Sequence, residues 1–213
     1  MNMGEVFSLA GENPAIEGLT ISKRLRDDNS QYIFSLAAGT DISGEAYGEE
    51  KLEIVLEGKA EFCTPSSALS VKAGDILITP VGVPVGTEAL EDTVYIEIEL
   101  GRNKMVNEKV KAGEVFALKE LVPYRKDSII NLDVVHNTKM KFVVMAFDGG
   151  TALSEHAAPG DAVIFALEGE GIIGYEGKEY TIKEGENFRF EKGGKHYVKA
   201  DNPFKMALLL SFE

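Results

Sequence analysis

Histidines are the residues of this chain best suited to acid–base or ligand chemistry, and there are three: His136, His156 and His196. An imidazole exchanges a proton near neutral pH, hydrogen-bonds polar ligands and binds divalent metal ions through a ring nitrogen. His156 lies in LSEHAAPGDAVIFALEGEG, Leu153–Gly171, where Pro159–Gly160–Asp161 indicates a turn. His196 lies in a later glycine-rich stretch. The chemistry of such a pair therefore depends on a fold that brings the two rings together.

The segments around these histidines have the pattern of β-strands. Apolar and polar residues alternate in KLEIVLEG (51–58) and TVYIEIEL (93–100), as in a strand with one buried face. Tyr32–Gly39 and Lys141–Gly150 are strand-like and end in glycine turns. Gly101–Phe116 is polar and charged, and we expect a linker there with one helical turn or two. Many short strands with regular turns predict an all-β sandwich or barrel.

The chain consists of two similar halves. The tetrapeptide GEVF occurs at Gly4–Phe7 and again at Gly113–Phe116. Glycines recur at a constant separation of 111 residues, in the pairs Gly58 and Gly169, Gly74 and Gly185, and Gly82 and Gly193. A repeat of this length indicates duplicated domains rather than a solenoid. We expect an N-terminal domain at 1–100, a linker at 101–116 and a C-terminal domain at 117–213.

Composition restricts the partners of the protein. Acidic residues outnumber basic ones by 35 to 22, and the formal charge of −13 argues against nucleic-acid or membrane partners. Cys63 is the single cysteine, so an intramolecular disulfide is impossible and a reducing compartment is favoured. The first residues do not resemble a signal peptide, and no apolar run reaches the length of a transmembrane helix. We therefore expect a cytoplasmic protein.

Both halves resemble the cupin family, whose small jelly-roll barrels carry two motifs. The first motif is glycine, five residues, His-x-His, three or four residues, glutamate, six residues and glycine. The second is glycine, five residues, Pro-x-Gly, two residues and histidine. The second half matches this frame at Gly150, His156, Gly169, Gly185, Gly193 and His196, and the first half at Gly39, Gly58, Gly74, Pro80 and Gly82. The resemblance implies two tandem cupin barrels, each an RmlC-like double-stranded β-helix, and the C-terminal half also resembles small single-barrel bacterial cupins.

The resemblance also implies where a metal would bind. Metal-binding cupins hold the ion with the two histidines of the first motif, its glutamate and the histidine of the second motif. The C-terminal half keeps His156 and His196 but has Ala158 and Ala162 at the other two positions. An alanine side chain has no donor atom, so half of the expected ligand set is missing. The small alanines also predict room for a ligand beside the histidines.

Three interpretations of the histidine pair remain open. The pair could hold a weakly bound divalent metal ion, bind a polar ligand or transfer protons without metal, or consist of two hydrogen-bonded interior residues. The nearest carboxylates, Glu155 and Asp161, are one residue from inward positions, and strand parity turns them outward. Arg189 and Tyr197 flank the second motif and are candidates for ligand contact, together with Glu155, Ala158 and Ala162.

The N-terminal half has lost the metal-ligand pattern. Its two histidine positions hold Glu45 and Tyr47, its glutamate position holds Lys51 and its last histidine position holds Val85. We expect no metal site there and a structural role for this barrel. Glu45 and Lys51 either pair inside the barrel mouth or lie in solvent at its rim, and the desolvation cost of buried pairs favours the rim. His136 precedes a strand and is expected at a turn or rim.

These observations favour a cupin-type small-molecule-binding protein with its ligand pocket in the C-terminal barrel. The expected partner is a small polar or anionic organic molecule. The alternative is an enzyme of the isomerase, lyase or dioxygenase type, in which His156 and His196 are catalytic with or without a weakly bound divalent metal ion. A structural or interaction protein is the third hypothesis. Cupins often pair through sheet edges, which makes a homodimer a further hypothesis.

Overall fold

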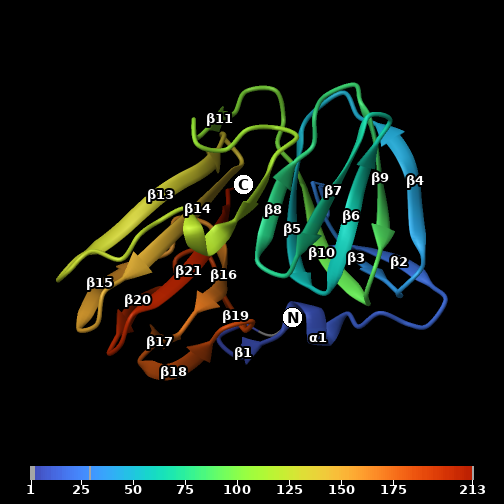
Figure 1. The fold of residues 1–213 in the computed structure, drawn as a ribbon. Coiled ribbons are helices and arrows are strands. Elements are labelled where there is room, and N and C mark those ends of the chain that lie inside the picture. The colour runs from blue at the N-terminus through green and yellow to red at the C-terminus, as the bar shows by residue number, and fades with distance from the viewer. Residues whose placement is uncertain (1–2, 29, 213) are drawn as a thin grey trace. The chain divides into compact units, whose positions relative to one another are not determined.

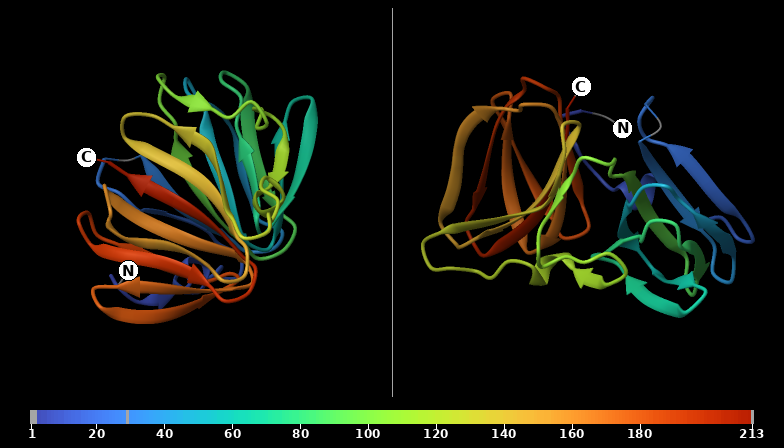
Figure 2. Two further views of the ribbon diagram at one scale, coloured as in Figure 1. Left: turned by 90° about the vertical axis from the view of Figure 1, so that its left-hand side faces the viewer. Right: turned by 90° about the horizontal axis from the view of Figure 1, so that it is seen from above.

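The computed structural model describes residues 3–28 and 30–212, which form an almost entirely β structure. The described residues divide into two compact units. The unit called the N-terminal barrel comprises Ala10–Asn103 and Glu108–Ala117. The unit called the C-terminal barrel comprises the residues up to Leu9, the segment Lys104–Asn107 and the chain from Leu118 onward. The strands of each barrel can be followed in Figures 1 and 2.

The N-terminal barrel is built from two antiparallel sheets. The larger sheet has the order β12-β8-β5-β10-β3-β2, with strands Val115–Ala117, Asp75–Ile78, Lys51–Glu57, Thr93–Glu99, Gln31–Leu36 and Thr20–Arg24. The smaller sheet has the order β4-β9-β6-β7, with strands Asp41–Ala46, Pro84–Ala89, Lys59–Thr64 and Ser67–Lys72. Side chains of both sheets meet in one core, where Leu36, Val55 and Tyr95 join Phe62 and Val85. The strand alternation predicted from the sequence is what supplies these inward residues.

The C-terminal barrel repeats this arrangement. Its larger sheet has the order β1-β19-β16-β21-β14-β13-β11, with strands Val6–Phe7, Asn187–Phe190, Asp161–Glu168, Phe204–Ser211, Met140–Phe147, Ile129–His136 and Met105–Val106. Its smaller sheet has the order β15-β20-β17-β18, with strands Thr151–Ala157, Lys195–Ala200, Glu170–Tyr175 and Lys178–Lys183. Its core contains Phe147, Phe188, Phe190 and Phe204. Burying each of these rings contributes about 1.5–3 kcal/mol.

The repeat of 111 residues is also a repeat of backbone geometry. Gly58 and Gly169 both adopt the left-handed conformation, with φ of 78° and 77°. A Cβ atom at Gly58 would lie 2.0 Å from the carbonyl oxygen of Asp92, and one at Gly169 would lie 2.5 Å from that of Pro203. Both glycines are therefore required by the same turn, which explains why LEG occurs at the same place in both halves.

The two GEVF segments are exchanged between the units. β1, from the N-terminal GEVF, pairs with β19 in the C-terminal barrel, and Leu9 donates its backbone N–H to Asn187 Oδ1 at 2.9 Å. β12, from the second GEVF, pairs with β8 in the N-terminal barrel. Figure 1 shows β1, in blue, beside the orange strands of the C-terminal barrel. Each barrel thus takes an edge strand from the segment that precedes the other barrel in the sequence.

Helices are few and short. A one-turn helix, α1, spans Leu9–Glu12, and a 3-10 turn, η1, spans Leu118–Glu120. The segment 101–116 contains β11 and most of β12 instead of the expected helical turn, because both strands extend a sheet edge. In the described ranges, no helix has the length and apolar character needed to cross a membrane.

Candidate functional site

The structure brings His156 and His196 together. They face each other on the neighbouring strands β15 and β20, and their ring centroids are 4.2 Å apart with an interplanar angle of 54°. A register shift in β15 between Leu153 and His156 precedes this pairing. Two residues from the two separate motifs therefore form one imidazole pair in the C-terminal barrel.

Backbone hydrogen bonds fix how the two rings present their nitrogens. Nδ1 of His156 lies 2.9 Å from the carbonyl oxygen of Ser154, and Nδ1 of His196 lies 3.1 Å from that of Gly194. A carbonyl oxygen only accepts, so each Nδ1 carries the hydrogen and donates it. In the neutral rings, each Nε2 then has a free lone pair. Among the residues that the structure describes, neither Nε2 has a hydrogen-bond partner.

The two imidazoles differ in environment. His196 is 6% exposed and stacks on Phe190 with ring centroids 4.1 Å apart, whereas His156 is exposed. Burial lowers the pKa of His196, and the neighbouring His156 lowers it further, while the hydrogen bond to the Gly194 carbonyl acts in the opposite direction. Burial therefore favours the neutral form of His196, and the exposed His156 ring is the part of the pair that is open to solvent.

The alanines predicted to leave room are buried in the core. Ala158 and Ala162 belong to the same hydrophobic cluster as Phe188 and Phe190. Phe190 lies opposite Ala162 in the β16–β19 pairing and also stacks on His196. Aromatic rings thus occupy the barrel interior next to the alanines, where the sequence predicts space for a ligand.

The remaining predicted ligand-binding residues do not converge on the imidazole pair. Glu155 is exposed. Arg189 forms an ion pair with Asp161 at 3.6 Å, and its neighbours along β19 point into the core. The Tyr197 hydroxyl donates a hydrogen bond to Glu179, which raises the pKa of Tyr197. Arg189 and Tyr197 therefore have other partners on the outer faces of their sheets.

The residues present do not fit a resident metal of the cupin type. The pair supplies two nitrogen donors, and Ala158 and Ala162 supply none. Asp161, the nearest alternative, contacts Arg189 and accepts a hydrogen bond from the backbone N–H of Lys192. Two donors fall short of the three or four protein ligands of typical metal sites. The imidazole pair therefore lacks the ligand set of a cupin metal site.

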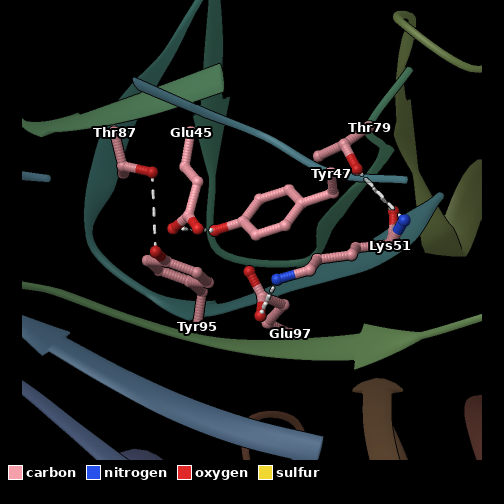
Figure 3. A network of polar contacts seen from close by, with 7 residues as sticks. All are labelled: Glu45, Tyr47, Lys51, Thr79, Thr87, Tyr95 and Glu97. Atoms are coloured by element: carbon pink, nitrogen blue, oxygen red, sulfur yellow. Dashed lines mark hydrogen bonds and ion pairs between the residues drawn. The ribbon is translucent and has the colours of Figure 1, made fainter. Parts of the chain in front are cut away.

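The N-terminal barrel contains a larger polar cluster, which the sequence did not predict. Lys51 Nζ lies 2.6 Å from Glu97 Oε1, and both side chains are 13% exposed. The same ammonium lies 3.3 Å from the centroid of the Tyr47 ring, and the Tyr47 hydroxyl donates to Glu45 at 3.2 Å. Figure 3 shows the Tyr47 hydroxyl directed toward Glu45 and the Lys51 side chain reaching Glu97. The expected solvated rim agrees with the exposed Glu45 but is wrong for Lys51, which pairs with Glu97 and is largely buried.

Glu53 is the most deeply buried member of this cluster. It lies opposite Glu97 in the β5–β10 pairing and is 2% exposed. Burial raises the pKa of Glu53 well above its ordinary value, the charge of Glu97 raises it further, and Lys51 opposes the shift. Because Lys51 bonds Glu97, burial without a cationic partner favours the protonated form of Glu53. Its Oε2 has no hydrogen-bond partner in the part of the chain that the structure describes.

Tyrosine and threonine side chains extend the cluster. The buried Tyr95 hydroxyl lies 3.5 Å from Thr87 Oγ1, and burial raises the pKa of Tyr95 well above its ordinary value. Thr79 accepts a hydrogen bond from the backbone N–H of Lys51 at 3.0 Å. The available sequence signal was the alternation of polar and apolar residues in β10 and, apart from Val55, in β5. That signal does not reveal which face of the strands lies inside the barrel.

A cavity of about 520 Å³ lies in the N-terminal barrel beside Cys63. Asp41, Thr64 and Glu88 also line it. In the described residues, one group of three or more side chains with metal-ligating atoms within reach of each other is found, Glu61, Cys63 and Glu88. Burial and the charges of both glutamates raise the pKa of the Cys63 thiol. A thiol held protonated in this way is a poor nucleophile.

Comparison with known proteins agrees with this architecture. The cupin domain model matches residues 143–212, a stretch that includes the imidazole pair. A cupin 2 conserved barrel domain protein from Leptotrichia buccalis has a TM-score of 0.85 and 24% identity, covering 100% of this chain and 98% of its own. No curated protein matches the chain by sequence.

Two enzymes share the fold at lower similarity. Salicylate 1,2-dioxygenase from Pseudoaminobacter salicylatoxidans has a TM-score of 0.64 and 12% identity, with 97% of this chain and 83% of the enzyme covered. Oxalate decarboxylase from Bacillus subtilis has a TM-score of 0.58 and 11% identity, with 99% and 78% covered. At these identities the likeness concerns the fold alone. The chain thus carries a cupin domain at residues 143–212 and has the cupin fold along its length.

Proposed function

We propose that the protein binds a small polar or anionic organic molecule at His156 and His196 in the C-terminal barrel. The observation that carries this proposal is the imidazole pair with both Nδ1 atoms tied to backbone carbonyls. Two Nε2 atoms are then available to a ligand from neighbouring strands. Imidazoles in this arrangement accept hydrogen bonds when neutral and donate them when protonated.

Proton linkage distinguishes the two kinds of ligand. A ligand hydroxyl or ammonium group donates to a neutral Nε2 and needs no proton uptake. A carboxylate favours the protonated pair, so its binding raises the pKa of the imidazoles and takes up a proton. Carboxylate binding is therefore expected to strengthen as the pH falls from about 8 to about 6, across the ordinary titration range of histidine.

An acid–base enzyme is the second candidate function. It is favoured by the unequal environments of the two rings, since the buried His196 has a lowered pKa and His156 is exposed. Two titratable groups whose environments differ can act as acid and base in one reaction. An isomerase or lyase reaction, in which one ring removes a proton and the other returns it, would use this division without metal.

Isothermal titration calorimetry with malonate tests the binding proposal. A ligand at 100 times its dissociation constant stabilises a protein by about 2.7 kcal/mol, so thermal unfolding supplies an independent readout. We expect malonate binding at about pH 6 to be lost in His156→Ala, because this exposed ring is half of the pair. The matched control is His136→Ala, which removes the other histidine of this barrel, on β13. Equal binding by both variants, or no binding by the wild type, would contradict the proposal.

A further inference from the structure

We propose that the interior of the N-terminal barrel is a second binding site, which holds a small hydroxyl-bearing molecule without negative charge through Glu53, Lys51 and Tyr47. This site is separate from the imidazole pair and does not depend on it. Its residues occupy a barrel for which the sequence predicts only a structural role.

The first support is the unpartnered oxygen of Glu53. The side chain is 2% exposed, and its Oε2 has no hydrogen-bond partner within the described residues. Glu53 lies on the same face of β5 as Val55, which belongs to the barrel core, so the carboxyl group points inward. Buried polar atoms in folded proteins nearly always have a partner. The free oxygen therefore marks a place for an atom that the chain itself does not supply.

The second support is the mixture of donors and acceptors around that oxygen. The Lys51 ammonium has three N–H donors, of which one is directed to Glu97 and the Tyr47 ring lies beside the group. The neutral carboxyl group of Glu53 offers both a donor and an acceptor. The Tyr47 oxygen can accept while its hydrogen is directed to Glu45. A hydroxyl group both donates and accepts, so it satisfies such a mixed set better than a group that only accepts.

The third support is the charge of the cluster, which selects against anions. The carboxyl groups of Glu45 and Glu97 outnumber the single ammonium group of Lys51, and burial favours the neutral form of Glu53. Glu45 is exposed, and Tyr47 is partly exposed, so an entering molecule meets a carboxylate first. An anionic ligand is repelled there, whereas a neutral or ammonium-bearing ligand is not.

The fourth support is that the fold does not require these polar residues. At a separation of 111 residues, the C-terminal barrel has Ala158 for Tyr47, Ala162 for Lys51, Ile164 for Glu53 and Leu208 for Glu97. These apolar residues pack in or against the core of that barrel. Apolar residues of similar volume are often as stabilising as a buried ion pair, or more so. The polar set in the N-terminal barrel is therefore best explained by what it binds.

Three sugars with one ring and different charges test the proposal: glucose, glucosamine and glucuronate. The titrations use the His156→Ala protein, so that anion binding at the imidazole pair makes no contribution. We expect glucose and glucosamine to bind, and glucuronate to bind at least about tenfold more weakly, a difference that calorimetry resolves. Glu53→Leu should abolish sugar binding while the protein remains folded, since the equivalent residue of the other barrel is Ile164.

Several results of these titrations would contradict the proposed sugar site. The absence of glucose and glucosamine binding overturns it and leaves an internal water as the partner of Glu53. Equal affinity for glucuronate overturns the charge argument, and unchanged sugar binding by Glu53→Leu places the sugar elsewhere. If Glu53→Leu does not fold, Tyr47→Phe removes one hydroxyl from a partly exposed ring, and it should weaken glucose binding several-fold. Unchanged affinity in Tyr47→Phe contradicts the site equally well.

Discussion

The two barrels share one backbone frame but place their polar side chains at different positions of it. In the C-terminal barrel, two motif positions hold the imidazoles of His156 and His196, and the neighbouring inward positions hold Ala158 and Ala162. In the N-terminal barrel, the position of His196 holds the core residue Val85, and the largely buried Lys51, Glu53 and Glu97 lie on strands β5 and β10 of the larger sheet. The frame therefore accepts either arrangement, and each barrel has its own chemistry.

The two barrels also differ in the polar groups that they bury and in how the cost of desolvating those groups is offset. The C-terminal barrel buries the His196 ring, which hydrogen-bonds the Gly194 carbonyl, and the Lys205 ammonium, which donates to the Lys119 carbonyl. The N-terminal barrel desolvates Lys51 and Glu97, and the close ion pair between them offsets that cost only while both partners are present. The N-terminal barrel should therefore be sensitive to the loss of either partner of this pair.

The largest expected effect follows from removing the cation of the N-terminal cluster. Lys51→Met leaves Glu97 buried without its partner and should lower the free energy of unfolding by about 3–5 kcal/mol. Denaturant unfolding at neutral pH measures this loss. The matched control is Lys59→Met, an exposed lysine on β6, which should change the stability by less than about 0.5 kcal/mol. Similar stability of the two variants would mean that the Lys51 pair is solvated.

The next effect concerns the exchanged strand. Leu9 follows β1 and is 2% exposed, so Leu9→Ala should cost about 2–4 kcal/mol through lost burial and a residual cavity. Faster amide hydrogen exchange in β19, the strand that β1 pairs with, would locate the damage in the C-terminal barrel. Damage confined to the N-terminal barrel would contradict the exchange.

A smaller effect is expected in the pH dependence of stability, because the pKa of Glu53 is raised above that of an exposed carboxyl group. Its pKa is raised in the folded protein, so its contribution to stability is complete below the ordinary pKa and is lost as the pH rises through the folded value. Glu53→Gln should therefore gain stability relative to the wild type with increasing pH, by about 1.4 kcal/mol for each unit of pKa elevation. Unfolding measured across the pH range tests this. The control Glu57→Gln, on the same strand and exposed, should show no such trend.

The smallest effect is a titration in the C-terminal barrel. NMR should show His196 titrating below the ordinary histidine value of about 6.5, because the ring is buried. The depressed pKa means that stability is lost as the pH falls from the ordinary value through the folded one. His156→Ala should raise the pKa of His196, because the electrostatic effect of the neighbouring imidazole is removed. An unchanged or lower value would show that the rings do not interact.

The sequence predicts much of the fold and part of the site. The alternation of polar and apolar residues and the recurring glycines predict two β domains. The structure explains the repeat, because Gly58 and Gly169 close the same turn in the two barrels. His156 and His196 are predictable because both lie at motif positions. The cluster around Glu53 and Glu97 is not, because these residues meet through the register of β5 and β10, which no local pattern specifies. The filling of space by Phe190 likewise depends on tertiary packing.

A crossed calorimetric titration shows whether the two barrels hold separate sites. Malonate and glucose are titrated into the wild type, His156→Ala and Glu53→Leu. With separate sites, His156→Ala loses malonate binding and keeps glucose binding, while Glu53→Leu loses glucose binding and keeps malonate binding. If one substitution abolishes both or neither affects its ligand, the barrels do not hold two independent sites.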